Sequence, residues 1–232
     1  MCQSTDNTRK GQGGDDDGGI VIRHYKDEDQ DQVHKLFQAG MMSLVPNLFW
    51  KSVLSPVFVV VTAVAAMLVL HVSLSLLYTI LTIFGMMAIL YSISYHAFYG
   101  YVQGSIKDDL SKIQEVYIQP GGCFLVAVDS KNGNIVGCVA GEKKGDHKYE
   151  LRRMSVSKQI QGRGLAKRLI RRLEQECGKK GMLFLTTSYV QYAAIGLYKK
   201  HGFQLKKTIT YEEGMFRFLS TFELYYFEKE LK

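Results

Sequence analysis

The fold is decided by a six-residue turn, Gln161-Gly162-Arg163-Gly164-Leu165-Ala166, which separates an apolar run at 149–156 from an amphipathic run at 165–177. Apolar residues recur through the second run at the spacing of one helix face, so we expect a helix there. Glycine and alanine let backbone amides approach a ligand, and the first N–H groups of a helix have no partner within it. The turn therefore predicts a pyrophosphate site, with an ordinary strand-to-helix turn as the alternative. It fits neither the three-glycine dinucleotide fingerprint nor the P-loop.

Apolar β-like runs flank this turn on both sides. Those before it are 20–23, 123–128, 135–142 and 149–156, with a hairpin signal at Asn132-Gly133. Those after it are 182–187, 203–210 and 222–227, and a helical run at 191–200 separates the first two. Strands in direct succession before the turn, and strands alternating with helices after it, predict one mixed α/β sheet.

A long charge-free segment interrupts this pattern, because residues 52–106 contain no Asp, Glu, Lys or Arg. A helix needs about 20 residues to cross a hydrocarbon core of ~30 Å, so the segment is long enough for two passes. The break at 71–75 predicts transmembrane helices at 53–70 and 76–98. The flanking Lys51 and Lys107 place both ends on the cytoplasmic side by the positive-inside rule. A buried helical hairpin of a soluble protein is the alternative.

These patterns divide the chain into four parts. Residues 1–19 are polar and glycine-rich and are expected to be disordered. Residues 20–50 supply the first strand and an amphipathic helix, 51–104 the transmembrane hairpin, and 105–232 the rest of the α/β domain. We expect the last part to open with a helix capped at Ser105, whose apolar face carries Ile106, Leu110, Ile113 and Tyr117.

Composition narrows the classes of partner. The net charge of +7 suits phosphate-bearing ligands and anionic lipid, but no basic stripe is interleaved with aromatic residues, so nucleic acid is not expected. The four cysteines form no CxxC pair and are expected to be reduced and cytosol-facing. The histidines have no metal-ligand spacing, and no metal is expected.

Two motifs carry a resemblance to a known family. Gln161 to Ala166 fill the pattern Gln-x-x-Gly-x-Gly/Ala of the acetyl-CoA loop in the GCN5-related N-acetyltransferase (GNAT) superfamily. Downstream, residues 191–203 resemble the family's Asn-x-x-Ala-x-x-Leu-Tyr-x-x-x-Gly-Phe helix, with Gln191 where Asn is usual. The resemblance implies a mixed sheet of the acyl-CoA N-acyltransferase type, interrupted here by the inserted hairpin, and acetyl-CoA as the acetyl donor.

Within that superfamily, the chain resembles the camello-like, or N-acetyltransferase 8, group more closely. The residues concerned are 122–127, 150–156, 164–167 and the apolar hairpin that follows the first strand and helix. This resemblance implies a multi-pass protein of the endoplasmic reticulum membrane. It also implies acetylation of small amino acids, cysteine S-conjugates or protein lysines.

The resemblance also assigns roles within the site. Tyr198 is the candidate proton donor to the CoA sulfur, with a buried structural aromatic as the alternative. Glu150 is the candidate general base, with a strand-end charge paired to an arginine as the alternative. By the same resemblance, the predicted acetyl-CoA contacts are Met154, Ser155, Val156, Gln161, Gly162, Arg163, Gly164, Leu165, Ala166, Gln191, Ala194 and Tyr198.

Four further residues are expected to contact the acceptor. Arg152 and Arg153 carry guanidinium groups that fit a carboxylate, although both could equally be solvated strand charges. Ser188 and Tyr189 follow the next strand. On a regular strand, Glu150, Arg152, Met154 and Val156 would share one face.

The sequence thus predicts a membrane-bound N-acetyltransferase for a small amino acid or a cysteine S-conjugate. A protein-lysine N-acetyltransferase is the second enzymatic hypothesis. A membrane hairpin protein that binds CoA without turnover is the non-enzymatic one.

Overall fold

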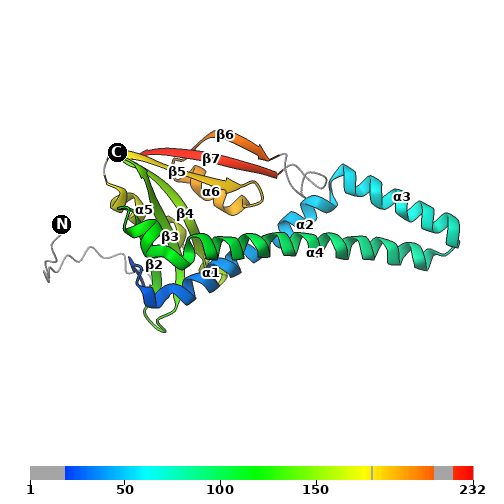
Figure 1. Ribbon diagram of the computed structural model, residues 1–232, viewed down its shortest axis with the longest axis horizontal. Coiled ribbons are helices and arrows are strands. Elements are labelled where there is room, and N and C mark those ends of the chain that lie inside the picture. Colours follow the sequence, from blue (N-terminus) through cyan, green and yellow to red (C-terminus); the bar gives the residue numbers. More distant parts are fainter. Residues whose placement is uncertain (1–18, 179, 212–221, 232) are drawn as a thin grey trace, which may run out of the picture.

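A seven-stranded sheet forms the body of the protein (Figure 1). The computed structural model describes residues 19–178, 180–211 and 222–231, so the predicted tail, apart from Gly19, lies outside it. The strands are β1 (Ile20–His24), β2 (Cys123–Asp129), β3 (Ile135–Gly145), β4 (Lys148–Val156), β5 (Gly181–Ser188), β6 (Gln204–Tyr211) and β7 (Phe222–Leu231). Their order is β1-β2-β3-β4-β5-β7-β6, and β4–β5 is the parallel pair. The predicted mixed sheet is confirmed.

Helices cover both faces of this sheet. They are α1 (Gln30–Met42), α2 (Val45–Val53), α3 (Pro56–Ser73), α4 (Leu76–Asp108), α5 (Leu165–Cys177) and α6 (Tyr192–Lys200). Short turns of tighter or wider helix lie at Asp27–Asp29, Leu110–Lys112, Gln114–Ile118 and Lys158–Ile160. Helices α5 and α6 have the predicted positions, whereas the amphipathic helix α2 was not predicted.

Two hydrophobic clusters hold the layers together, and alternate residues of β2 enter each. Leu125 and Ala127 pack in the cluster that contains α5 and α6, while Phe124 and Val126 pack in the cluster that contains α1 and the end of α4. This is the period-two alternation of a strand covered on both faces. The α5 residues predicted to form one apolar face are all buried: Leu165, Leu169, Ile170, Leu173 and Cys177.

The prediction that a new helix begins at Ser105 is wrong. Helix α4 runs without a break from Leu76 to Asp108, and Ser105 is buried within its last turn. Ser105 is not an N-cap because the helix continues through it, and its hydroxyl accepts a hydrogen bond from the Arg153 guanidinium (2.8 Å). Leu110, Ile113 and Tyr117 are nevertheless buried together, as expected from their spacing.

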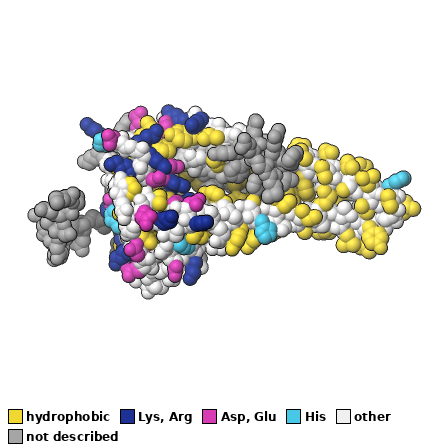
Figure 2. Space-filling model, in the orientation of Figure 1, with side chains coloured by type: hydrophobic (Ala, Val, Ile, Leu, Met, Phe, Trp, Pro, Cys, Tyr) yellow, Lys and Arg dark blue, Asp and Glu magenta, His cyan; other side chains and the backbone are white. Residues whose placement is uncertain are grey.

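Helices α3 and α4 extend away from the sheet as an antiparallel hairpin (Figure 1). Both are long and apolar enough to cross a membrane, yet 0% and 6% of their most apolar windows are buried. The buried-hairpin alternative is therefore wrong. Figure 2 shows hydrophobic side chains over the hairpin and charged ones over the sheet.

The predicted start of the first hairpin helix is three residues too early. Residue Val53 ends α2, and α3 begins at Pro56 with Ser55 as its N-cap, whose hydroxyl accepts from the Phe58 amide (3.3 Å). Proline suits the first position of a helix, because the N–H that it lacks would have no partner within the helix. At the far end, α4 extends ten residues beyond the predicted Phe98, into the folded domain.

Replacement of Gly122 should test the close packing between β2 and β3. A Cβ at Gly122 would lie 2.2 Å from the carbonyl oxygen of Gly141 and 2.7 Å from that of Tyr117. Because both neighbours are backbone, we expect Gly122→Ala to lower the free energy of unfolding by about 2 kcal/mol or more. Thermal unfolding in one detergent would measure this. The control is Gly104→Ala in α4, where a Cβ meets nothing within 4 Å; equal melting temperatures would contradict the prediction.

Candidate active site

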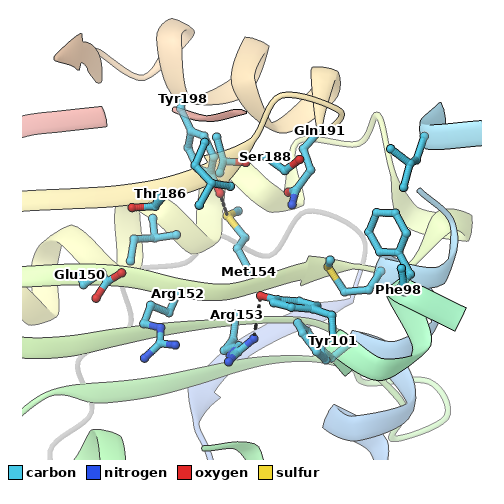
Figure 3. Close-up of a pocket in the computed structure, with 17 residues that line it drawn as sticks. Phe98, Tyr101, Glu150, Arg152, Arg153, Met154, Thr186, Ser188, Gln191 and Tyr198 are labelled. Carbon is cyan, nitrogen blue, oxygen red and sulfur yellow. Dashed lines mark hydrogen bonds between the residues drawn. The ribbon is translucent and has the colours of Figure 1, made fainter. Parts of the chain in front are cut away.

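A cleft opens where β4 and β5 stop pairing. The two strands are paired only from Lys148↔Met182 to Glu150↔Phe184, after which β5 continues beside β7. The resulting cavity has a volume of about 450 Å³. Its walls come from β4, β5, α6 and the helices α1, α2 and α4 (Figure 3).

The glycine turn leaves its backbone open to a ligand. Gly162 and Gly164 both have positive φ, 81° and 79°, and a Cβ at either position would meet nothing within 4 Å. Residues 161–164 are exposed, and α5 starts directly after them at Leu165. The Gln161 side chain is held by a hydrogen bond from its Nε2 to the Val156 carbonyl (3.1 Å). The turn thus lies at the N-terminus of α5, where the first N–H groups and the positive end of the helix dipole suit a negatively charged ligand.

A bulge in β4 changes which side chains face the cleft. Ser155 pairs with Cys138 but Arg152 with Ala140, so β4 has one extra residue, and Arg153 has φ of 53°. A bulge shifts the residues beyond it to the other face. The prediction that Met154 shares a face of β4 with Glu150 and Arg152 is therefore wrong. Met154 packs with Leu151 on the side of the sheet that α5 covers.

Tyr198 reaches across the cleft from α6 to β4. Its hydroxyl lies 3.8 Å from the sulfur of Met154, and its ring contacts Phe203 and Phe227. Burial raises the pKa of the phenol above its ordinary value, so Tyr198 is protonated at neutral pH.

Glu150 and Arg152 lie on the other wall (Figure 3). The nearest cation to Glu150 is Lys144, 3.6 Å away, so the predicted arginine partner is not what holds it. Arg152 donates to Glu142 (2.7 Å) and is partly exposed. Burial acts to raise the pKa of Glu142, but the hydrogen bonds from Lys144 and Arg152 outweigh it and lower that pKa.

Arg153 is engaged inside the protein. Its side chain is 7% exposed, and it donates to Asp109 (2.8 Å), Ser105 (2.8 Å) and Tyr101 (3.3 Å). Burial alone would lower the pKa of Arg153, but the hydrogen bond to Asp109 reverses the effect and raises it. Asp109 also accepts a hydrogen bond from Tyr117, which completes a buried network between α4 and β4.

The remaining predicted site residues divide into two groups. Ser188, Gln191 and Met154 line the cavity. Tyr189 instead packs in a cluster with Leu48 and Phe98, and Ala194 packs against the α5 core.

Known proteins resemble this chain in sequence. Residues 88–203 match the model of the acetyltransferase (GNAT) family. A mouse protein named "Probable N-acetyltransferase family 8 member 5" is 32% identical over 214 residues, which cover 89% of this chain and 92% of that protein. The chain belongs to the GNAT family. The superfamily predicted from the two motifs, and the N-acetyltransferase 8 group predicted from residues 122–127, 150–156, 164–167 and the apolar hairpin, are thereby confirmed.

Other relatives agree with this GNAT assignment. The rat N-acetylaspartate synthetase is 32% identical over 191 residues, 80% of this chain and 63% of that protein. The chain thus spans less than two thirds of the length of that relative. Among solved structures, a GNAT-family acetyltransferase from Staphylococcus aureus Mu50 has a TM-score of 0.54 at 15% identity, covering 92% of this chain and 99% of that one. That likeness concerns the fold alone.

Several residues of the GNAT cleft were not identified from sequence. Helices α1, α2 and α4 contribute Phe37, Met41, Leu48, Phe98 and Tyr101. Phe98 lies in the charge-free segment, where an apolar residue is expected to contact the membrane. Asp109 carried a weak signal, as an aspartate at the end of a long apolar helix. The described residues contain no group of three or more His, Cys, Asp or Glu side chains that could hold a metal ion.

The cysteines offer a test of the site chemistry. Burial raises the pKa of Cys123, Cys138 and Cys177 to about 12 each, so few thiolates exist at neutral pH. In full-length protein with Cys2→Ser, we expect a chromogenic disulfide reagent at pH 8 to label no thiol within minutes, and to label all three after denaturation. Immediate labelling of one thiol in the native protein would show an activated cysteine and contradict this.

Proposed function

We propose that this GNAT chain transfers acetyl from acetyl-CoA to the amino group of a small amino acid or cysteine S-conjugate. The observation that carries the proposal is the cleft between the diverging β4 and β5, with Tyr198 and Glu150 on its walls. The open glycine turn that precedes α5 supports it. The family match and the N-acetyltransferase names of its relatives support the reaction class.

The residues present fit acetyl-CoA. The amides of Gly162 to Ala166 are proposed to hold the pyrophosphate, with Gln161 and Arg163 beside it. Past Glu150, the edge of β4 is no longer paired with β5, so the backbone of Met154, Ser155 and Val156 is proposed to bond the pantetheine arm. Gln191 and Ala194, at the start of α6, are also proposed to contact acetyl-CoA. Acetyl-CoA supplies an activated thioester carbonyl.

Two side chains are proposed to move the protons. The attacking amine must be neutral, and we assign Glu150 as the group that accepts its proton, directly or through a water molecule. Tyr198 is buried and protonated, so it can donate to the sulfur as the thiolate departs. Transfer forms the N–C bond of an amide and breaks the S–C bond of the thioester.

The acceptor carboxylate is assigned to Arg152. Both arginines line the cavity, but the side chain of Arg152 is 31% exposed, whereas that of Arg153 is 7% exposed and is hydrogen-bonded to Asp109, Ser105 and Tyr101. Arg153 is then proposed to orient the bulge that positions Arg152. Ser188 lies on the cavity wall, and Tyr189 is proposed to support it from the adjoining cluster. An amino-acid acceptor also agrees with the names of the N-acetylaspartate synthetases.

The enzyme is proposed to be anchored in a bilayer by α3 and α4. Their exposure, length and lack of charge support membrane insertion. Lys51 and Lys107 support a cytoplasmic catalytic domain. The resemblance to the N-acetyltransferase 8 group supports the endoplasmic reticulum as the location.

Substitution of the two proposed catalytic residues tests the function. We expect Tyr198→Phe and Glu150→Gln each to lower kcat about 100-fold or more, with little change in the KM for acetyl-CoA, because proton transfer contributes factors of this size. The measurement is CoA release with aspartate, S-substituted cysteines and lysine peptides as separate acceptors. Activity only on lysine peptides would favour the protein-lysine hypothesis.

Tyr192→Phe is the matched control. Tyr192 stands on the same helix and is exposed, so its loss should leave kcat within twofold. If the variants of Tyr198 and Glu150 behave like this control, or if wild-type protein binds acetyl-CoA without turnover, the catalytic assignment is wrong.

Arg152→Gln tests recognition of the acceptor. A hydrogen bond to a charged group contributes about 1.5–3 kcal/mol, so we expect the KM for a carboxylate-bearing acceptor to rise about 10- to 100-fold. The KM for acetyl-CoA should stay unchanged, and Arg171→Gln on the exposed side of α5 should change neither value. An equal rise in both KM values would point to general damage of the cleft.

A further inference from the structure

One wall of the cleft is built from the helices that lead into the apolar hairpin. Leu48 of α2 and Phe98 and Tyr101 of α4 line the cavity, and Figure 3 shows Phe98 and Tyr101 at the end away from Glu150. Leu48 and Phe98 also belong to a buried cluster with Val45 and Tyr189. The cleft therefore has a charged end on β4 and an apolar end on α2 and α4.

The outer side of the same two helices carries a group of aromatic residues, here called the aromatic belt. It comprises Phe49, Trp50, Tyr91, Tyr95 and Tyr99, and the last four are between 41% and 56% exposed. Phe49 packs edge-on against Tyr91 at 5.6 Å, and Tyr95 stacks on Tyr99 at 6.3 Å. Trp and Tyr are enriched where a protein passes from hydrocarbon to water. The belt therefore indicates the headgroup level of the membrane.

The length of α4 agrees with this placement. Exposed Tyr78 stands near the other end of the helix, 17 residues before Tyr95. At about 1.5 Å a residue, the two tyrosines are ~26 Å apart along the axis, close to the ~30 Å of a hydrocarbon core.

The apolar end of the cleft and the aromatic belt lie at the same level along α2 and α4. Leu48 lines the cleft and Phe49 is in the belt; Phe98 lines the cleft and Tyr99 is in the belt. Consecutive residues of a helix differ by only about 1.5 Å along its axis. The Lys51 ammonium, which suits lipid phosphates, lies 5.9 Å from the ring centre of Tyr189, in the same cluster as Leu48 and Phe98.

We infer that the acetyl acceptor enters the cleft from the membrane interface, past Leu48 and Phe98. This inference rests on the proposed function. The acceptor is then a single-chain amphiphilic amino acid: its carboxylate pairs with Arg152, its amine faces Glu150, and its apolar chain follows the hairpin helices toward the lipid. The bilayer concentrates such a molecule at the level of the cleft.

Tryptophan fluorescence tests the depth without any turnover. Trp50 is the only tryptophan of the chain, so its emission in phosphatidylcholine vesicles reports the belt. We expect lipids brominated near the headgroup end of the acyl chains to quench it more than lipids brominated near the methyl end. A second protein, Phe98→Trp in a Trp50→Phe background, should show the same preference. The inference is overturned if the single tryptophan of that second protein is insensitive to both lipids.

A chain-length series tests the route. The acceptors are linear 2-amino acids from 2-aminobutyrate to 2-aminododecanoate, with full-length protein in vesicles. Because each methylene adds apolar surface that leaves water, we expect the apparent KM to fall about fourfold per methylene. Added protein-free vesicles should slow acetylation of the longest acceptor and leave that of the shortest unchanged. A pair of variants tests the apolar wall of the cleft. Leu48→Ala should weaken the dependence of KM on chain length, whereas Leu81→Ala on the exposed side of α4 should not.

The outcomes separate this inference from the function on which it rests. Interfacial entry would be overturned by a KM that does not depend on chain length, or by rates that do not change when vesicles are added. In both cases the protein would still be an acetyltransferase. No acetylation of any acceptor, aspartate included, would instead overturn the proposed function, and the quenching result would still decide the depth of the cleft. Acetyl-CoA affinity checks that Leu48→Ala remains folded.

Discussion

The short parallel contact between β4 and β5 is the constraint on which the site depends. Three residue pairs hold the strands together, and the sheet then opens, because β5 follows β7 while β4 stays with β3. A longer parallel ladder would close the cavity and satisfy the β4 backbone within the sheet. As it is, Tyr198 and the stretch of β4 that no longer pairs with β5 border one opening.

The buried network around Asp109 ties this opening to the hairpin. Asp109 directly follows α4, and its carboxylate accepts hydrogen bonds from Tyr117 and Arg153, so the end of a long apolar helix is fixed to the bulge in β4. Removing one partner of such a buried pair typically costs about 3–5 kcal/mol. These hydrogen bonds therefore fix the end of the hairpin against the bulged part of β4 that lines the cleft.

Local pattern predicted most of this fold, and the exceptions have physical causes. The α5 face, the glycine turn and the break near residue 74 followed from spacing and residue type. The β4 bulge did not, since Arg153 adopts a positive φ that its residue type does not favour and that its partners Asp109, Ser105 and Tyr101 hold in place. Likewise Ser105 looked like an N-cap because the sequence does not show that its hydroxyl faces a buried arginine. Leu48 and Phe98 could not be placed in the cleft from sequence. An apolar side chain in or beside a candidate membrane-spanning segment could face either lipid or the protein interior, and the sequence does not distinguish the two.

The pairing of β1 with β2 has a consequence for biosynthesis. His24 lies opposite Leu125, and the whole apolar hairpin separates the two strands in the chain. As the ribosome works from the amino end, β1 and α1 are made first and wait, unpaired, until the hairpin and β2 have followed. A delay in folding of the hairpin would leave that early strand edge open to other chains.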